Sequence, residues 1–81
     1  MISETEKNRM QAGYKQVLRA LGEQRAEKVY LASDCEDKIK TPVEEQAEKS
    51  GCPVFYAESM KELGRLCGIK VKASCAVVLK N

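Results

Sequence analysis

Helix-like and strand-like segments alternate along this chain of 81 residues, and this alternation constrains its fold more than any other feature. Short apolar runs of strand formers are predicted to form strands at residues 28–33, 54–57 and 74–80. Apolar residues at helical spacing and helix-start signals predict helices at residues 2–10, 13–22, 41–50 and 59–67. A weak strand is expected between the first two helices. Such alternation places helices on both faces of a sheet, so the fold class is predicted to be α/β, a three-layer α/β/α sandwich with a central mixed sheet of about four strands.

Helix boundaries carry recognisable signals. Three predicted helices begin with Ser or Thr followed three residues later by Glu, the pattern of a capping box. These pairs are Ser3–Glu6, Thr41–Glu44 and Ser59–Glu62. Pro42 suits the first position of the third helix, which leaves residues 34–40 as a polar connection. Glycines are predicted to end the second, third and fourth helices, at Gly22, Gly51 and Gly68.

The length is that of one small domain, predicted to span residues 1–81. A chain of this size buries roughly 60–65% of the surface that its unfolded form exposes, which supports one modest core. No apolar run approaches the roughly 18 residues of a membrane span, so no membrane partner is expected. The first ten residues lack the apolar core of a secretory signal. We therefore expect a cytoplasmic protein, and a monomer.

The four cysteines, Cys35, Cys52, Cys67 and Cys75, follow one another at offsets of 17, 15 and 8 residues. Zinc sites usually contain close pairs such as C-x-x-C, and none is present, so no metal is predicted. Cys67 and Cys75 lie among apolar residues and are predicted to be small core side chains. Cys35 follows an aspartate in the polar connection and is predicted to be exposed.

The charges are segregated along the chain although the net charge is only +2. Residues 7–28 carry six basic and two acidic side chains, and residues 59–81 carry five and one. Residues 35–58 carry three basic and six acidic side chains. This distribution favours an anionic partner for a basic pole built from both ends of the chain, whereas each single lysine is equally consistent with a solvated helix face.

The residues needed for common enzymatic sites are missing. The chain has no histidine, which excludes Ser-His-Asp and Cys-His arrangements. It also lacks a G-x-x-x-x-G-K-[ST] phosphate loop and a G-x-G-x-x-G fingerprint. The adjacent Glu44 and Glu45 point in different directions on a helix, as solvated residues do. No catalytic residue and no cofactor is predicted, so the chain is expected not to be an enzyme.

The stretch AGYKQVLRAL offers the best candidate site. If a helix begins at Gly13, Lys15 lies in its first turn with Gln16, and Arg19 lies four residues after Lys15. Two cations near a helix start repel each other and oppose the helix dipole. An anion bound to the free N–H groups there would offset this cost, while Gln16 could read a base edge. The alternative is an amphipathic helix with a solvated basic face.

Several stretches together resemble a known family. These are GYKQVLRAL, VYLASD, TPVEE and ESMKELGRLCGIKVKASCAVVL. They resemble the bacterial branch of the kink-turn-binding ribosomal proteins, the superfamily of L7Ae and L30e, over about residues 13–79. The most specific parts are G-x-K-Q-x-x-[KR]-A and S-M-K-x-L-G-x-x-C-G-I-x-V.

The resemblance implies an α/β/α sandwich and binding of a kink-turn, an RNA element that bends sharply beside sheared guanine–adenine pairs. The family's contacts at the start of the second helix fall on Gly13, Tyr14, Lys15, Gln16 and Arg19. Archaeal and eukaryotic members carry asparagine and glutamate at the positions of Lys15 and Gln16, whereas Lys-Gln is the bacterial form. Tyr14 replaces a small hydroxyl residue, and it either stacks on a base or packs inward.

The resemblance places a second contact surface in the loop before the last strand, at residues 69–73. Ile69 and Val71 would cover a splayed nucleotide, and Lys70 and Lys72 would face phosphates. Lys72 stands where the family usually keeps glycine or alanine. The alternative is that Ile69 is the ordinary hydrophobic contact of a helix C-terminus and that Val71 opens the last strand.

The leading hypothesis is a non-enzymatic RNA-binding protein that recognises kink-turn RNA, with the ribosome or another ribonucleoprotein as the candidate assembly. One alternative is a protein-interaction module that keeps the fold without binding RNA. A third reading, a thiol-based redox protein, would need an exposed thiol of low pKa at Cys35.

Overall fold

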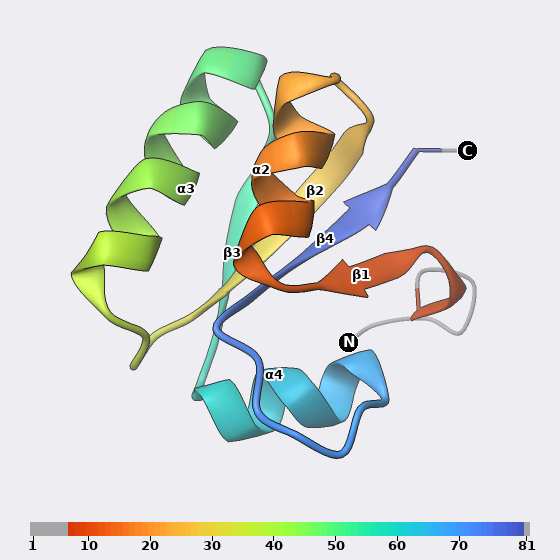
Figure 1. The fold of residues 1–81 in the computed structure, drawn as a ribbon, viewed down its shortest axis with the longest axis vertical. Coiled ribbons are helices and arrows are strands. Elements are labelled where there is room, and N and C mark those ends of the chain that lie inside the picture. Colours follow the sequence, from red (N-terminus) through yellow and green to blue (C-terminus); the bar gives the residue numbers. More distant parts are fainter. Residues whose placement is uncertain (1–6, 81) are drawn as a thin grey trace.

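The computed structural model describes residues 7–80. Four strands and three helices follow one another along this part of the chain (Figure 1). In order they are β1 (Met10–Ala12), α2 (Tyr14–Gly22), β2 (Ala26–Ala32), α3 (Asp37–Ser50), β3 (Val54–Ala57), α4 (Met60–Cys67) and β4 (Cys75–Leu79). None of these helices is long and apolar enough to cross a membrane.

The strands form one mixed sheet in the order β1-β4-β2-β3. β4 lies antiparallel to both of its neighbours, β1 and β2, whereas β2 and β3 run parallel. β4 has four of its five residues buried, as its continuous apolar run predicts. β1 and β3 form the two edges of the sheet. The predicted α/β/α sandwich with four strands is confirmed.

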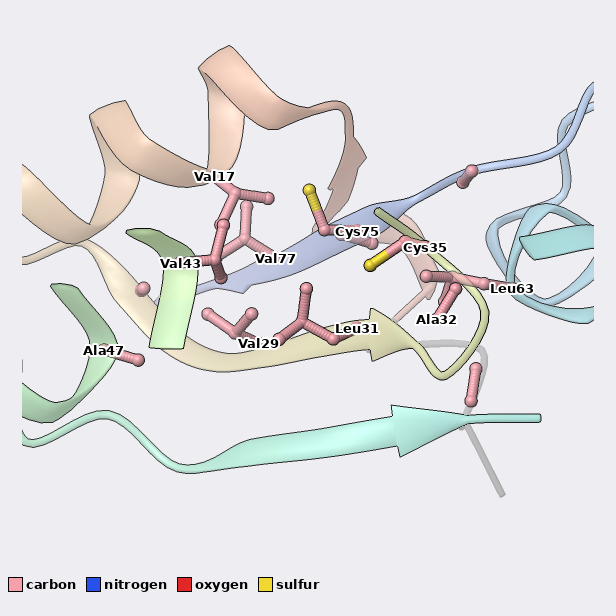
Figure 2. Close-up of a cluster of buried hydrophobic side chains, with 14 of the residues drawn as sticks. Val17, Val29, Leu31, Ala32, Cys35, Val43, Ala47, Leu63, Cys75 and Val77 are labelled. Atoms are coloured by element: carbon pink, nitrogen blue, oxygen red, sulfur yellow. The ribbon is translucent and has the colours of Figure 1, made fainter. Parts of the chain in front are cut away.

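The two faces of the sheet are covered by different helices. Val29 and Leu31 of β2 point toward α2 and α3, where Val17 and Val43 complete a cluster of fully buried side chains (Figure 2). Side chains alternate along a strand, so Ala32 points to the opposite face, beside Leu63 of α4 (Figure 2). The eight residues of α4 cover only part of that second face.

Several predicted helix ends are confirmed. The Ser59 hydroxyl accepts a hydrogen bond from the Glu62 amide at 3.1 Å and thereby caps α4. Gly51 and Gly68 follow α3 and α4 in the left-handed conformation. α2 also ends at its predicted residue, Gly22, but the left-handed residue in the following turn is Gln24, at φ 58°.

The predicted start of the third helix is wrong. α3 begins at Asp37 with Glu36 as its N-cap, so Thr41 is not a cap and Pro42 lies inside the helix. The Glu36 carbonyl accepts hydrogen bonds from the amides of Ile39 and Lys40, both at 3.0 Å, which closes an additional first turn. Pro42 is the sixth residue of α3, where proline costs the helix one main-chain hydrogen bond and crowds the carbonyl four residues earlier, so the added turn must offset this cost. The additional turn packs Ile39 against the core.

The early start of α3 also corrects the prediction for Cys35. The turn that leads into the helix buries this residue, whose exposed fraction is 6%. Cys75 is fully buried, and Cys67 is half-buried against the core, as predicted. Among residues 7–80, no cluster of three or more cysteine and acidic side chains could hold a metal ion.

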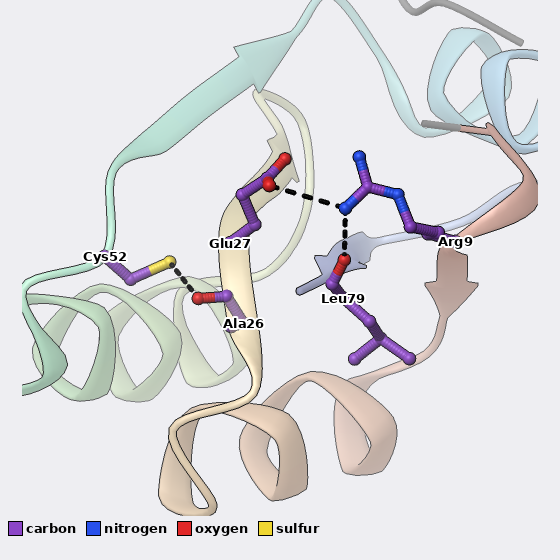
Figure 3. Close-up of polar contacts among 5 residues, drawn as sticks. All are labelled: Arg9, Ala26, Glu27, Cys52 and Leu79. Atoms are coloured by element: carbon purple, nitrogen blue, oxygen red, sulfur yellow. Dashed lines mark hydrogen bonds and ion pairs between the residues drawn. The ribbon is translucent and has the colours of Figure 1, made fainter. Parts of the chain in front are cut away.

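The first predicted helix falls mainly on residues 2–6, so its capping pair Ser3–Glu6 lies outside the described residues. Residues 7–8 are helical, but Met10 belongs to β1, the weak strand expected after that helix. Arg9 joins this segment to the sheet, because its Nη1 atom donates to the Leu79 carbonyl at 2.7 Å and lies 3.4 Å from Oε1 of Glu27 (Figure 3). In the same view the Cys52 thiol donates a long hydrogen bond to the Ala26 carbonyl, which ties the turn after α3 to β2 (Figure 3).

Candidate nucleic-acid interface

The start of α2 is open to an incoming anion. Gly13 precedes the helix at φ 122° and ψ 145°, and no side chain caps the helix start. The first turn contains no acidic residue. The first free N–H groups of a helix attract anions because they carry the positive end of the helix dipole. This end of α2 therefore offers main-chain donors with no carboxylate competing for them.

The predicted side chains of α2 take different positions. Lys15, Gln16 and Arg19 are exposed. Arg19 lies in the last turn of this nine-residue helix, where a cation is favourable, so only Lys15 opposes the dipole. This corrects the expectation that both cations do so. Tyr14 is half-buried and packs against the core, which is the inward alternative of the two considered for it.

Gly13 is favoured by its main-chain conformation. A φ of 122° is strained for any residue with a Cβ. The Oε1 atom of Gln16 lies 3.3 Å from the position that a Cβ would take on Gly13. The carboxamide of Gln16 therefore lies over the open helix start, where it can both donate and accept hydrogen bonds.

The second predicted surface is a loop and not the beginning of a strand. β4 starts only at Cys75, so Val71 does not open it. Ile69 and Val71 are exposed by 39% and 70%, which is unusual for branched apolar side chains in a small protein. Lys70 and Lys72 are exposed beside them. The loop thus presents apolar and cationic groups to solvent together.

This loop is held against α4 along its length. The Ile69 amide donates to the Gly64 carbonyl at 3.1 Å, and the Ala73 amide donates to the Met60 carbonyl at 3.0 Å. Gly64 is buried, and a Cβ at this position would collide with the Val71 carbonyl oxygen. The exposed side chains of the loop therefore project from a fixed main chain.

The two surfaces lie at the same end of the sheet. The Gly13 amide donates to the Cys75 carbonyl at 3.0 Å, which joins the start of α2 to the residue where the loop enters β4. Antiparallel pairing of Ala12 with Ala76 brings the end of β1 beside the start of β4. Figure 1 shows the first turn of α2 and the segment leading into β4 next to each other. The nine predicted site residues thus form two adjoining surfaces: Gly13, Tyr14, Lys15, Gln16 and Arg19 on one, and Ile69, Lys70, Val71 and Lys72 on the other.

Some cations form ion pairs within the protein, whereas those of the candidate site do not among the described residues. Arg9 pairs with Glu27, and Arg25 pairs with Glu23 at 3.1 Å. Arg65 pairs with Glu62 on α4. Over residues 7–80, none of the ion pairs involves the four cations of the site, which are Lys15, Arg19, Lys70 and Lys72. These four charges are available to neutralise an external anion.

The structure adds Lys7, which the sequence does not single out. The Cε atom of Lys7 lies 2.6 Å, and its Nζ atom 3.2 Å, from the position that a Cβ would take on Gly68. Its side chain therefore crosses the end of α4 and brings a further ammonium group to the loop that starts at Ile69. Only the fold brings residue 7 next to residue 68, so no local pattern could have revealed this neighbour.

The thiols do not form a reactive site. Burial raises the pKa of the Cys35 thiol above its ordinary value, and neighbouring carboxylates add to this effect, although Lys40 acts against it. The pKa of the Cys75 thiol is raised to about 11, mainly by burial. A redox-active cysteine needs an accessible thiolate at neutral pH, which these surroundings disfavour.

Comparison with known proteins identifies the family of the chain. Residues 3–81 match the ribosomal protein L7Ae/L30e/S12e/Gadd45 family. An RNA-binding protein of Caldanaerobacter subterraneus subsp. tengcongensis is 41% identical over 64 residues, which cover 79% of this chain and 78% of that protein. RNA-binding protein YbxF of Geobacillus stearothermophilus is 38% identical over 68 residues, covering 84% of this chain and 83% of its own.

A solved structure shows a similar fold. The 15.5 kD RNA-binding protein of Giardia lamblia superimposes with a TM-score of 0.78 at 26% sequence identity. The superposition covers 91% of this chain but only 62% of the Giardia protein. From the extent of the family match and the identity to its relatives, the chain belongs to the ribosomal protein L7Ae/L30e/S12e/Gadd45 family.

Proposed function

We propose that this chain is a non-enzymatic RNA-binding protein that recognises kink-turn RNA. The observation that carries the proposal is the junction of an uncapped helix start, bearing Lys15 and Gln16, with a fixed loop that exposes Ile69 and Val71. The names of its relatives support RNA as the partner. The kink-turn itself is inferred from the bacterial Lys-Gln form of the family's contact motif.

Each surface has a distinct task in this proposal. The main-chain donors of the first turn bind a phosphate at the bend, and Lys15 and Arg19 neutralise the neighbouring phosphates. Gln16 hydrogen-bonds to a guanine edge, because its amide can donate and accept. Ile69 and Val71 cover the nucleotide that the kink displaces from the stack, while Lys70, Lys72 and Lys7 contact its backbone.

Binding in this manner selects the bent form of the RNA. The loop and the helix start are fixed by hydrogen bonds, so the two surfaces match only an RNA whose backbone is already kinked. The protein then shifts the population of the RNA toward the kink without any catalytic step. We further propose that it acts as a cytoplasmic monomer within the ribosome or another ribonucleoprotein.

A gel-shift comparison tests the proposal. The probe is a kink-turn RNA, and its matched control replaces the guanine–adenine pairs with Watson–Crick pairs. We expect the protein to bind the kink-turn much more tightly than the control. Equal affinity for both RNAs would reject kink-turn recognition. If the protein binds no structured RNA at all, this result would favour the alternative, a protein-interaction module without RNA binding.

The salt dependence of binding tests the role of Arg19. The Arg19→Ala variant should bind more weakly to all RNAs and reduce the slope of log affinity against log salt by about 1. An unchanged slope would show that Arg19 contacts no phosphate.

A further inference from the structure

Strand β3 is an edge strand with unused main-chain hydrogen-bonding groups. Its inner side is occupied by β2, where the carbonyls of Pro53 and Ala57 accept from the amides of Val29 and Ser33. Main-chain groups alternate in direction along a strand, so those of Val54 and Tyr56 point away from the sheet. Within residues 7–80, no main-chain hydrogen bond to a loop or turn occupies these outward groups.

This edge has only some of the features that usually protect an edge strand: β3 is short, at four residues, but none of them is charged. Proteins commonly place charges, proline or a bulge there to prevent pairing with other chains. The strand VFYA carries no charge, and Pro53 precedes it. Phe55 and Tyr56 are exposed by 47% and 54% and point to opposite faces of the sheet. Of the described residues, the remaining large hydrophobic side chains with such exposure are Ile69 and Val71, in the proposed RNA site.

The surroundings of the edge are acidic. α3 runs antiparallel to β3 and joins it through a short turn, so Glu44 lies opposite Tyr56 and accepts a hydrogen bond from its hydroxyl group. Glu48 lies one turn further along α3, and the exposed Glu58 follows β3 directly. Two cations are also nearby. The Lys28 ammonium lies 5.7 Å from the centre of the Phe55 ring, and the Lys40 ammonium donates to the carbonyl of Ser33, whose amide pairs with Ala57 at the end of β3.

We propose that the β3 edge binds an extended, basic segment of a partner protein by adding a strand to the sheet. Such a segment would satisfy the outward main-chain groups of Val54 and Tyr56 and would lay apolar side chains on the two aromatic rings. Its lysines or arginines would face Glu44, Glu48 and Glu58. This surface is separate from the proposed RNA site. That site lies where β1 ends and β4 begins, whereas β3 forms the edge of the sheet opposite to β1.

The charges decide among the possible occupants of this edge. RNA would be repelled by the three glutamates. A second copy of this chain, paired strand to strand, would bring the same acidic residues together across its symmetry axis. A basic segment meets neither obstacle. Proteins that share an RNA molecule are themselves rich in lysine and arginine because they neutralise phosphates, so such segments are close at hand in a ribonucleoprotein.

An NMR titration of the full chain tests the inference. The probe is the peptide Lys-Val-Lys-Val-Lys-Val-Lys, and its control is the same peptide with glutamate for each lysine. We expect the basic peptide to shift the amide signals of Val54 and Tyr56 in a saturable way, and the acidic peptide to leave them unchanged. Equal shifts with both peptides, or none with the basic one, would overturn the proposal.

A pair of variants separates main-chain pairing from side-chain contact. Tyr56→Pro removes the outward N–H group, which an edge strand tolerates, whereas Tyr56→Ala removes the same side chain and keeps that donor. We expect Tyr56→Pro to weaken peptide binding about tenfold more than Tyr56→Ala does. Equal affinities for the two variants would exclude strand addition. Retained binding of the kink-turn RNA and an unaltered far-UV circular dichroism spectrum show that a variant keeps the fold. A Tyr56 pair that fails this check is replaced by Val54→Pro and Val54→Ala.

Three further measurements address charge and the rival occupants. The double variant Glu48→Lys, Glu58→Lys should lower the affinity for the basic peptide about tenfold at low salt, and unchanged affinity would contradict the charge argument. Sedimentation that shows a dimer in the unaltered chain and a monomer in Tyr56→Pro would overturn the proposal in favour of self-pairing. Shifts of the Val54 and Tyr56 signals by single-stranded RNA would overturn it in favour of a second RNA site.

Discussion

The buried thiol of Cys75 links the stability of the protein to pH. Burial raises its pKa from the ordinary 9.0 to about 11, because the thiolate is disfavoured between the sheet and α2. Below pH 9 the thiol is neutral in both the folded and the unfolded chain, so it does not change the free energy of unfolding. Between pH 9 and 11 only the unfolded chain releases the proton, which stabilises the unfolded state.

We therefore predict that the free energy of unfolding falls by up to about 2–3 kcal/mol between pH 9 and pH 11 through this one group. Urea unfolding at several pH values measures the fall. Cys75→Ala is the control, because it removes the titrating group while other residues still titrate. If the variant and the unaltered chain lose stability in parallel above pH 9, Cys75 does not cause the loss.

Lys7 provides a second prediction at the level of single residues. Its ammonium group lies beside the end of α4, next to the loop that carries Lys70. Lys7→Ala should weaken binding of the kink-turn RNA and reduce the salt slope by about 1, as the loss of one phosphate contact does. Lys49→Ala, which removes an exposed lysine from α3, should leave the slope unchanged. Equal salt slopes for the two variants would show that Lys7 does not contact the RNA.

The packing of the loop on α4 makes Gly64 a sensitive position of that element. Gly64→Ala places a Cβ against the Val71 carbonyl, so the loop must move away from the helix. We expect a loss of about 1–3 kcal/mol in unfolding free energy, as overpacking typically causes, together with weaker RNA binding. Thermal unfolding and the gel shift measure the two effects.

Gly22→Ala is the matched control for this change. Gly22 is also helical, but a Cβ there meets nothing within 4 Å. Alanine should therefore leave stability unchanged or raise it by up to about 1 kcal/mol, because it favours the helical conformation. If Gly64→Ala were equally harmless, the loop would not depend on close packing against α4.

The elements that the sequence predicts well are those whose signals are local. Ser59 caps α4, and the glycines at 51 and 68 end their helices, because each signal concerns only its immediate neighbours. The start of α3 is missed for the opposite reason. Thr41 and Pro42 form a valid local signal, but burial of Ile39 against the core favours one more turn. The burial of Cys35 depends on the same turn and is not predicted either.

The same distinction holds for the candidate site. The open helix start at Gly13 and the basic side chains behind it follow from the motif. The meeting of the two surfaces does not, because it depends on the pairing of β1 with β4 and on the hydrogen bond from Gly13 to Cys75. Strand order and the position of Lys7 are properties of the assembled sheet, which no local pattern encodes.

At the scale of the whole molecule, the segregated charges of the sequence become two poles. Ion pairs neutralise Arg9, Arg25 and Arg65 within the protein, whereas Lys15, Arg19, Lys70 and Lys72 form none among the described residues and lie on α2 and the loop before β4. The acidic segment, residues 35–58, forms α3 and β3 at the other edge of the sheet. One face is thus suited to RNA and the opposite edge to a basic protein segment.

The two poles should therefore bind their partners at the same time. In the sheet, β3 lies two strand spacings, about 10 Å, from β4 and three spacings, about 14 Å, from β1, and both separations exceed the Debye length of about 8 Å at physiological salt. We predict that saturation with kink-turn RNA changes the affinity for the basic peptide less than about threefold. Fluorescence anisotropy of a labelled peptide, with and without RNA, measures the change. Tyr56→Pro in the RNA complex is the control, since peptide that merely adheres to the RNA would still bind. Displacement of either partner by the other would show that the two surfaces overlap.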